Sequence, residues 1–255
     1  MHLFFLFAVS FVAWLISALA GGGSALVVLP AVGFILDARA IAPAVTTGML
    51  LGNSQRVLHF WRHVDWPLTR WYLPGAVIGA VLGAYLFTQI HLDWLQLLMG
   101  VFLLVTVVTF LVSRKDRIFP VSPWHFLPLG FLYALISGLV GSSGPLMNPF
   151  YLNYGLLKEP MIATKAAHVV GVHIVKLVAY GVLGVLHPQY LGYGLLIGVA
   201  AIPANWASQY FLDRMSDRQF RHLVLATMTV SGLFMTWSVL GDFLIKPEVV
   251  FGVTG

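Results

Sequence analysis

The stretch Ile16-Ser-Ala-Leu-Ala-Gly-Gly-Gly-Ser-Ala-Leu-Val-Val-Leu-Pro30 returns 120 residues later as Ile136-Ser-Gly-Leu-Val-Gly-Ser-Ser-Gly-Pro-Leu-Met-Asn-Pro-Phe150. The positions of the first stretch that recur unchanged in the second are Ile16, Ser17, Leu19, Gly21 and Leu26. At the same offset, Asn53 and Arg56 fall on His173 and Lys176. A duplicated apolar segment broken by glycine, followed by a helix with a buried cation, is typical of a transporter whose binding site lies between its repeats.

The composition is that of a membrane protein. Of 255 residues, 59% are hydrophobic and 9% are charged, whereas soluble domains carry about 25% charged residues. The basic excess does not indicate nucleic-acid binding, because the basic residues lie mostly in short loops between apolar runs, where they set membrane orientation. The chain has no cysteine, which excludes disulfides and thiolate chemistry. No Lys or Arg precedes the first apolar run at Leu3, so we expect a retained helix and not a cleaved signal.

Hydrophobic segments follow one another along the whole chain. They cover residues 3–20, 24–36, 40–61, 67–88, 92–113, 124–141, 145–157, 160–184, 189–212 and 219–241. The second and seventh segments have about 13 residues, or about 20 Å of helix, which is short of a hydrocarbon core about 30 Å thick. We therefore expect an all-α polytopic membrane protein made of two repeats of about five segments, each with a broken or half-length second segment.

The charged loops predict that the two repeats are inverted. Lys and Arg gather in the loop 62–70, in the linker 114–117 and in the loop 214–221, and they are absent from 88–93 and 185–190. Since positive loops stay cytoplasmic, the loop after the third segment is inside and its counterpart after the eighth segment is outside. The expected units are a first repeat over 1–113, a cytoplasmic linker over 114–123, a second repeat over 124–241 and a tail over 242–255. Both termini are predicted outside.

Three basic residues fall well inside predicted spans: Arg56, Lys165 and Lys176. A lone cation in lipid costs at least about 2.5 kcal/mol, so each must face protein, water or a ligand. At helical spacing, the polar residues of each segment form one stripe, which suits a lined cavity. The stripe of the third segment contains Thr46, Asn53 and Arg56, and that of the eighth contains Lys165, His168, His173, Lys176 and Tyr180.

The acidic residues all fall at segment ends or in loops. No carboxylate is therefore placed at mid-membrane to neutralise the buried cations. A small anionic substrate is a natural partner, because arginine binds an oxyanion with two parallel hydrogen bonds. The lack of hard oxygen ligands argues against a carrier of metal cations, and we expect no metal site and no cofactor.

The glycine breaks supply further candidate ligands of the anion. Each break precedes a short segment, and a turn followed by a helix N-terminus exposes N–H groups that attract anions. Irregular backbone at membrane depth is tolerated where it lines a cavity or is buried in protein. The candidate residues in the breaks are Gly23, Ser24, Ser142, Ser143 and Gly144.

Structural alternatives stay open for these residues. Arg56 and Lys165 could snorkel to the cytoplasmic surface and Lys176 to the opposite one, while His168 and His173 could be hydrogen-bonded packing residues. The glycines that we expect to serve only close helix packing are Gly75, Gly79 and Gly83.

With these motifs in place, the chain resembles the sulfite exporter TauE/SafE family over about residues 5–241. The resemblance lies in the paired breaks, in Leu51-Gly-Asn-Ser-Gln-Arg56 followed by Phe60-Trp-Arg-His-Val-Asp-Trp66, and in Ala163-Thr-Lys-Ala166 followed by His173 and Lys176. It implies transport of small anions, often sulfur oxyanions, across a bacterial or archaeal plasma membrane. Ser142 and Ser143 depart from the family pattern, which often has further glycines there.

We therefore expect a non-enzymatic carrier that exports a small oxyanion by alternating access at a midplane site between the repeats. Arg56 and Lys176 would bind the anion from opposite repeats, while Asn53, His173 and the serines orient it. Lys165, His168 and Thr46 are candidates for coupling or gating, since histidine titrates near neutral pH. The alternatives are a passive anion channel, an intramembrane serine protease using Ser24 or Ser143, and a non-transporting membrane subunit. The expected partners are the small anion and the lipid bilayer, with no nucleic acid.

Overall fold

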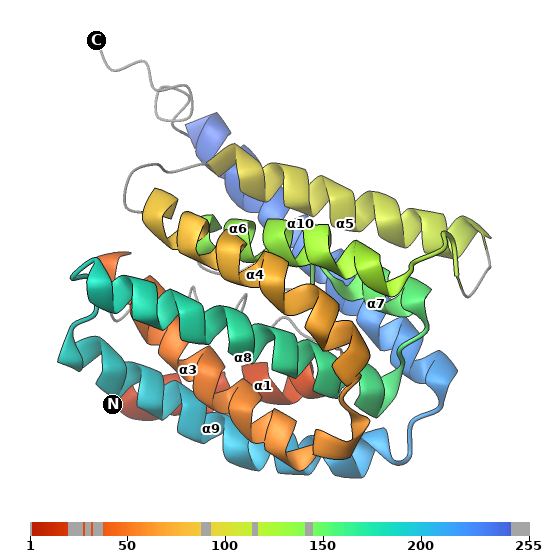
Figure 1. Cartoon of the computed structure of the whole chain (residues 1–255), viewed down its shortest axis with the longest axis horizontal. Helices are drawn as coiled ribbons and strands as arrows, with labels where there is room; N and C mark the ends of the chain where they lie inside the picture. Colours follow the sequence, from red (N-terminus) through yellow and green to blue (C-terminus); the bar gives the residue numbers. More distant parts are fainter. Residues whose placement is uncertain are drawn as a thin grey trace.

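A computed structural model describes residues 2–19, 28, 32, 38–87, 93–113, 117–140 and 145–245 of the chain. Within these ranges the regular structure is helical, which confirms the predicted all-α class. The helices are α1 (His2–Leu19), α3 (Ala38–His59), α4 (Trp66–Phe87), α5 (Asp93–Ser113), α6 (Phe126–Val140), α7 (Asn148–Tyr154), α8 (Lys158–Val182), α9 (Pro188–Leu212) and α10 (Asp217–Ile245), with 3₁₀ turns at Trp61–His63 and Pro123–His125. Their order follows the predicted segments (Figure 1). The predicted second segment lies outside the described residues except for Val28 and Val32.

The helices have the length and composition of a polytopic membrane protein. Helices α4, α8 and α9 are long and apolar enough to cross a membrane, and shorter apolar helices cover Leu3–Leu19, Leu97–Ser113 and Pro123–Leu139. Large apolar side chains such as Phe4, Val112 and Trp237 are strongly exposed, at 78%, 76% and 77% of their surface. Apolar exposure of this extent on helices from both ends of the chain fits a surface bathed in lipid.

The packed helix pairs stay the same when each helix is replaced by its counterpart in the other half of the chain. If α1, α3, α4 and α5 correspond to α6, α8, α9 and α10, then the packed pair α4 and α6 corresponds to α9 and α1. In the same way, α3 on α9 corresponds to α8 on α4, and the pairs α3–α8 and α5–α10 map onto themselves. In Figure 1, α3 runs from left to right and α8 runs from right to left. This packing is the one that two inverted repeats require.

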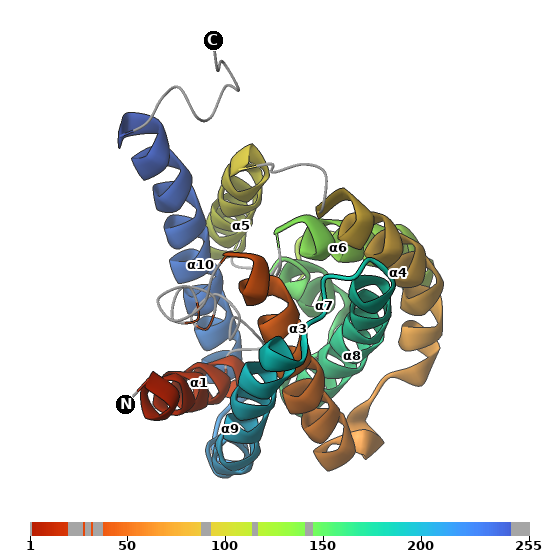
Figure 2. The same cartoon turned by 90° about the vertical axis from the view of Figure 1, so that its left-hand side faces the viewer.

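The packed units are two lobes that mix helices of both halves. Helices α1, α3 and α9 share one buried cluster, which includes Trp14, Met49 and Ile197. Helices α4, α6, α7 and α8 share another, which also receives residues of α5 and α10. Figure 2 shows the two groups side by side, with α3 and α8 facing each other between them. Each half of the chain thus gives one helix, α4 or α9, to the lobe of the other half.

Basic residues gather at one end of the molecule. The connections α3–α4 and α9–α10 and the segment that leads into α6 lie at the same end, while the α8–α9 connection lies at the opposite end (Figure 1). The first three carry Arg62, Arg117 and Arg214, and residues 183–187 between α8 and α9 carry no Lys or Arg. Such an asymmetry is the pattern expected for a membrane protein with its positive loops on one side.

The glycine ridge of α4 serves close packing, as predicted. A Cβ atom on Gly75, Gly79 or Gly83 would overlap or crowd the α6 backbone at Leu127, Phe131 and Leu135. Gly138 of α6 meets Gly83 in return, with a built Cβ 2.5 Å from the Gly83 Cα. The absence of side chains lets these two helices approach backbone to backbone.

Candidate functional site

The two predicted polar stripes meet where α3 packs against α8. Their side chains are buried, with exposed fractions between 0% and 7%. The buried members are Thr46, Asn53 and Arg56 on α3, and Lys165, His168, His173, Lys176 and Tyr180 on α8. Snorkelling is therefore wrong as an account of the three cations, because a snorkelling side chain would expose its charged end.

Arg56 is held by a neutral side chain of α9. Its Nε and Nη2 atoms donate to one oxygen, Oδ1 of Asn205, at 3.1 and 2.8 Å. The guanidinium carbon also lies 5.2 Å from the ring centroid of Trp14, which donates from its indole nitrogen to the Ile197 carbonyl at 3.1 Å. Among the described residues, Arg56 thus meets an amide oxygen and an aromatic face, and its charge is not cancelled by a carboxylate.

The orientation of the Asn205 amide is fixed by α3. Its Nδ2 donates to the Gly52 carbonyl at 3.1 Å and to Oε1 of Gln55 at 2.5 Å. Because both partners accept hydrogen bonds, the amide nitrogen faces them and the oxygen must face Arg56. Asn205 is fully buried. Sequence reasoning missed this residue, although a lone amide in the apolar run 195–207 was a signal that could have found it.

Lys165 belongs to the surroundings of Arg56. The Lys165 ammonium donates to Oδ1 of Asn148, at the start of α7, at 2.6 Å. It also lies close enough to the Arg56 guanidinium for the two charges to repel each other. The Nδ2 of Asn148 is buried and has no hydrogen-bond partner among the described residues. We call the group Arg56, Lys165, Asn148 and Asn205 the Arg56 site.

Lys176 lies at a different depth from Arg56. It follows Lys165 by eleven residues on the same helix, α8, or about 16 Å along the axis, and on nearly the same face. Its ammonium donates to the Ser137 carbonyl of α6 at 2.8 Å. In inverted repeats, a residue near one side of the membrane corresponds to a residue near the other side. Arg56 lies one turn from the end of α3, so its counterpart Lys176 is expected near the opposite side. The match of Arg56 with Lys176 along the sequence therefore does not by itself bring the two cations to the same depth, whereas Arg56 and Lys165 interact electrostatically.

Two other predicted residues are engaged in local contacts. Asn53 donates from its amide to the Met49 carbonyl of its own helix at 2.7 Å. His168 stacks on Tyr72 of α4 with ring centroids 3.9 Å apart and hydrogen-bonds through Nδ1 to the Tyr151 hydroxyl at 2.7 Å. These contacts describe packing between α4, α7 and α8. The candidate residues of the breaks, Gly23, Ser24, Ser142, Ser143 and Gly144, lie outside the described residues.

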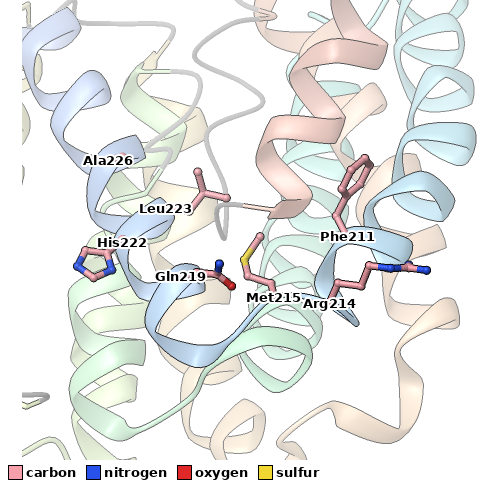
Figure 3. Close-up of a pocket in the computed structure, with 7 residues that line it drawn as sticks. All are labelled: Phe211, Arg214, Met215, Gln219, His222, Leu223 and Ala226. Atoms are coloured by element: carbon pink, nitrogen blue, oxygen red, sulfur yellow. The ribbon is translucent and has the colours of Figure 1, made fainter.

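Two cavities that are lined by described residues lie away from the buried cations. One, of about 570 Å³, lies between the end of α9 and the start of α10 (Figure 3). There Arg214 covers the Tyr210 ring at 3.5 Å and donates to the Tyr210 carbonyl, so its charge is directed to its own helix. A second cavity, of about 310 Å³, is lined by apolar residues of α5, α6 and α7. In this part of the chain no cluster of three His, Asp or Glu residues could hold a metal ion.

Comparison with known proteins gives one match. Residues 6–235 match the protein family described as sulfite exporter TauE/SafE. No curated protein and no solved structure matches the chain.

Proposed function

The chain belongs to the sulfite exporter TauE/SafE family, and from this we propose that it exports a small sulfur oxyanion, of the sulfite or sulfonate type, across a bacterial or archaeal plasma membrane. The Arg56 site is the first place where the anion binds. The positive loops would then face the cytoplasm and both termini would lie outside.

The observation that supports this proposal is that Arg56 and Lys165 are both buried and repel each other electrostatically. Two like charges close together in a poorly solvated interface repel each other, and each has lost its hydration. An oxyanion placed between them would relieve both costs. Arginine and lysine differ usefully here, because the guanidinium presents a planar fork of donors and the ammonium a compact charge.

The neutral acceptors favour binding that is reversible. Asn205 and Asn148 hold the two cations in position without a full negative charge. A carboxylate in either place would form a permanent ion pair and would compete with the substrate. An amide instead orients the cation and leaves its charge available to the anion.

Transport would follow from a movement of the two lobes about the α3–α8 interface. The connections 60–65 and 183–187 cross from one lobe to the other, which makes them the places where such a movement would be absorbed. The first connection is tied to α8, because the backbone N–H of Asp65 donates to the Thr164 hydroxyl at 2.9 Å. A carrier of this kind exposes its site to one side at a time.

The test is sulfite flux in liposomes that contain the full chain. We expect Arg56→Gln and Lys165→Met each to reduce flux by at least about 10-fold, because each removes one charge from the site. The matched control is Arg62→Gln, which removes the same charge from the exposed turn after α3. Flux through Arg56→Gln and Lys165→Met as high as through Arg62→Gln would contradict the proposal.

A passive anion channel is the alternative that the same residues permit. A carrier shows accelerated exchange when unlabelled sulfite is present on the opposite side, whereas a channel does not. Labelled sulfite measured with and without sulfite on the far side therefore separates the two. The protease alternative finds no support, because members of the matched family are transporters.

A further inference from the structure

A second group of polar side chains on α3 and α8 is buried away from the Arg56 site. It consists of Thr46 on α3 and of His173, Lys176 and Tyr180 on α8, which we call the Lys176 cluster. Their exposed fractions are 0% for Thr46, Lys176 and Tyr180 and 5% for His173. The three α8 residues follow Lys165 by eight to fifteen positions, and Thr46 faces Tyr180 from α3. The cluster therefore lies nearer the α8–α9 connection than the Arg56 site does.

Contacts and electrostatic interactions join these four side chains into one group. The Lys176 ammonium lies 6.0 Å from the ring centroid of Tyr180, and it is close enough to His173 for electrostatic repulsion. The Tyr180 side chain approaches Thr46 across the interface between the two helices. Ala42, Ala84 and Tyr180 form a small apolar cluster next to them.

Three polar atoms of the cluster lack a hydrogen bond of normal length and angle within the described part of the chain. They are the Thr46 Oγ1, the His173 Nδ1 and the Tyr180 hydroxyl, all of which are buried, and the Thr46 and Tyr180 hydroxyls face each other at longer range. Each such atom costs about 1–3 kcal/mol relative to water. Native proteins keep few of them, so three within one group indicate a ligand that pairs with them when it binds.

The donor chemistry identifies the class of ligand. Both hydroxyls can donate, a neutral imidazole can donate from Nδ1, and Lys176 supplies a positive charge. A cation would be repelled by Lys176, and an apolar molecule would leave the donors unpaired. A small oxyanion satisfies the charge and the donors together.

We propose that the Lys176 cluster is a second binding site for the transported oxyanion, separate from the Arg56 site and about 16 Å further along α8. This inference rests on the proposed function for the identity of the anion. An anion a few ångströms across cannot contact both lysines at that separation. The anion would occupy the two sites one after the other during transport, one site nearer each end of α8.

The test is the number of sulfite ions bound per chain, measured by equilibrium dialysis of labelled sulfite against the full-length protein in lipid nanodiscs. We expect two sites in the unmodified chain. Arg56→Gln should remove one site and Lys176→Met the other. Tyr180→Phe and Thr46→Val remove one hydroxyl each and keep size and charge, and each should weaken the second site by about 10-fold or more without changing the first.

Each result decides between the two proposals. No bound sulfite in the unmodified chain would overturn the proposed function itself. One bound ion, lost in Arg56→Gln and bound normally by Tyr180→Phe and Thr46→Val, would overturn the second site and leave the proposed function intact. One ion lost in both Arg56→Gln and Lys176→Met would show a single shared site, which also overturns the inference. If Lys176→Met does not fold, as judged by its elution and thermal unfolding, the two hydroxyl variants carry the test.

Discussion

Asn205 shows how one neutral side chain can keep a buried cation ready for a ligand. Its oxygen accepts two hydrogen bonds from Arg56, and its nitrogen is anchored to Gly52 and Gln55. The amide therefore has one possible orientation, and Arg56 is held in one place before the anion arrives. A site that is organised in advance loses less conformational freedom on binding.

We predict that Asn205→Asp weakens anion binding strongly. The substitution changes one NH₂ group into an oxygen, and the resulting carboxylate would pair with Arg56 at the position that the substrate charge should neutralise. Sulfite affinity measured by thermal shift should fall by at least about 10-fold.

The control for this prediction is one turn away on the same helix. Gln209 is half-buried and contacts the exposed His59 near the end of α3. Gln209→Glu makes the same chemical change there and should leave the affinity within about two-fold, since a partly exposed charge is screened by water. Unchanged sulfite binding by the Asn205→Asp protein would show that Arg56 does not bind the anion.

Among the helices, α4 and α6 pack most closely. Backbone meets backbone along the glycine ridge, so one added carbon atom on a glycine would overlap the α6 backbone. Protein interiors respond strongly to added volume, because little empty space exists to accept it.

We predict that Gly79→Ala destabilises the protein by about 3 kcal/mol or prevents its accumulation, because the added methyl group overlaps the Phe131 carbonyl. Gly192→Ala is the matched control. It lies in α9, and a Cβ built there meets nothing within 4 Å. Thermal unfolding in detergent should show a large loss for the first variant and none for the second. An equal effect of both would mean that helix propensity, and not packing, decides stability at these positions.

The sequence allowed prediction of much of this at the level of helices. Apolar runs and glycine spacing gave the boundaries of the spans and the ridge of α4, because both depend on residues close together in the chain. The burial of Arg56, Lys165 and Lys176 also followed from their place in apolar runs. What it could not reveal was Asn205, since its contact with Arg56 joins residues 149 positions apart. The expectation that Arg56 and Lys176 bind one anion together stays a prediction, because aligned positions in inverted repeats lie at mirrored depths and sequence alone does not show which residues meet.

For the whole molecule, the exchange of α4 and α9 between the lobes is the dominant feature. Neither half of the chain contains all helices of one lobe, because α1 and α3 need α9, and α6 and α8 need α4. The two halves are therefore repeats in sequence and partners in structure. The α3–α8 interface, formed by the two helices that carry the buried cations, is the surface along which the lobes can separate.

We predict that the halves cannot fold alone but can fold together. Residues 1–122 and 123–255, produced separately, should each be degraded, since each would expose the helix surfaces that its partner covers. Produced together from two genes, they should reassemble and restore sulfite flux to a measurable fraction of the intact level. Accumulation of either half alone as a protease-resistant protein would contradict this prediction.

Because α4 and α9 each pack in the lobe of the other half, some helices are synthesised long before their packing partners. At about 5–20 residues per second, the ribosome completes α6 roughly 3–10 s after α4, and it completes α9 roughly 8–30 s after α3. During these intervals the glycine ridge of α4 and the buried arginine of α3 have no partner helix. The nascent chain must wait in the membrane, or in the care of an insertase, until its second half arrives.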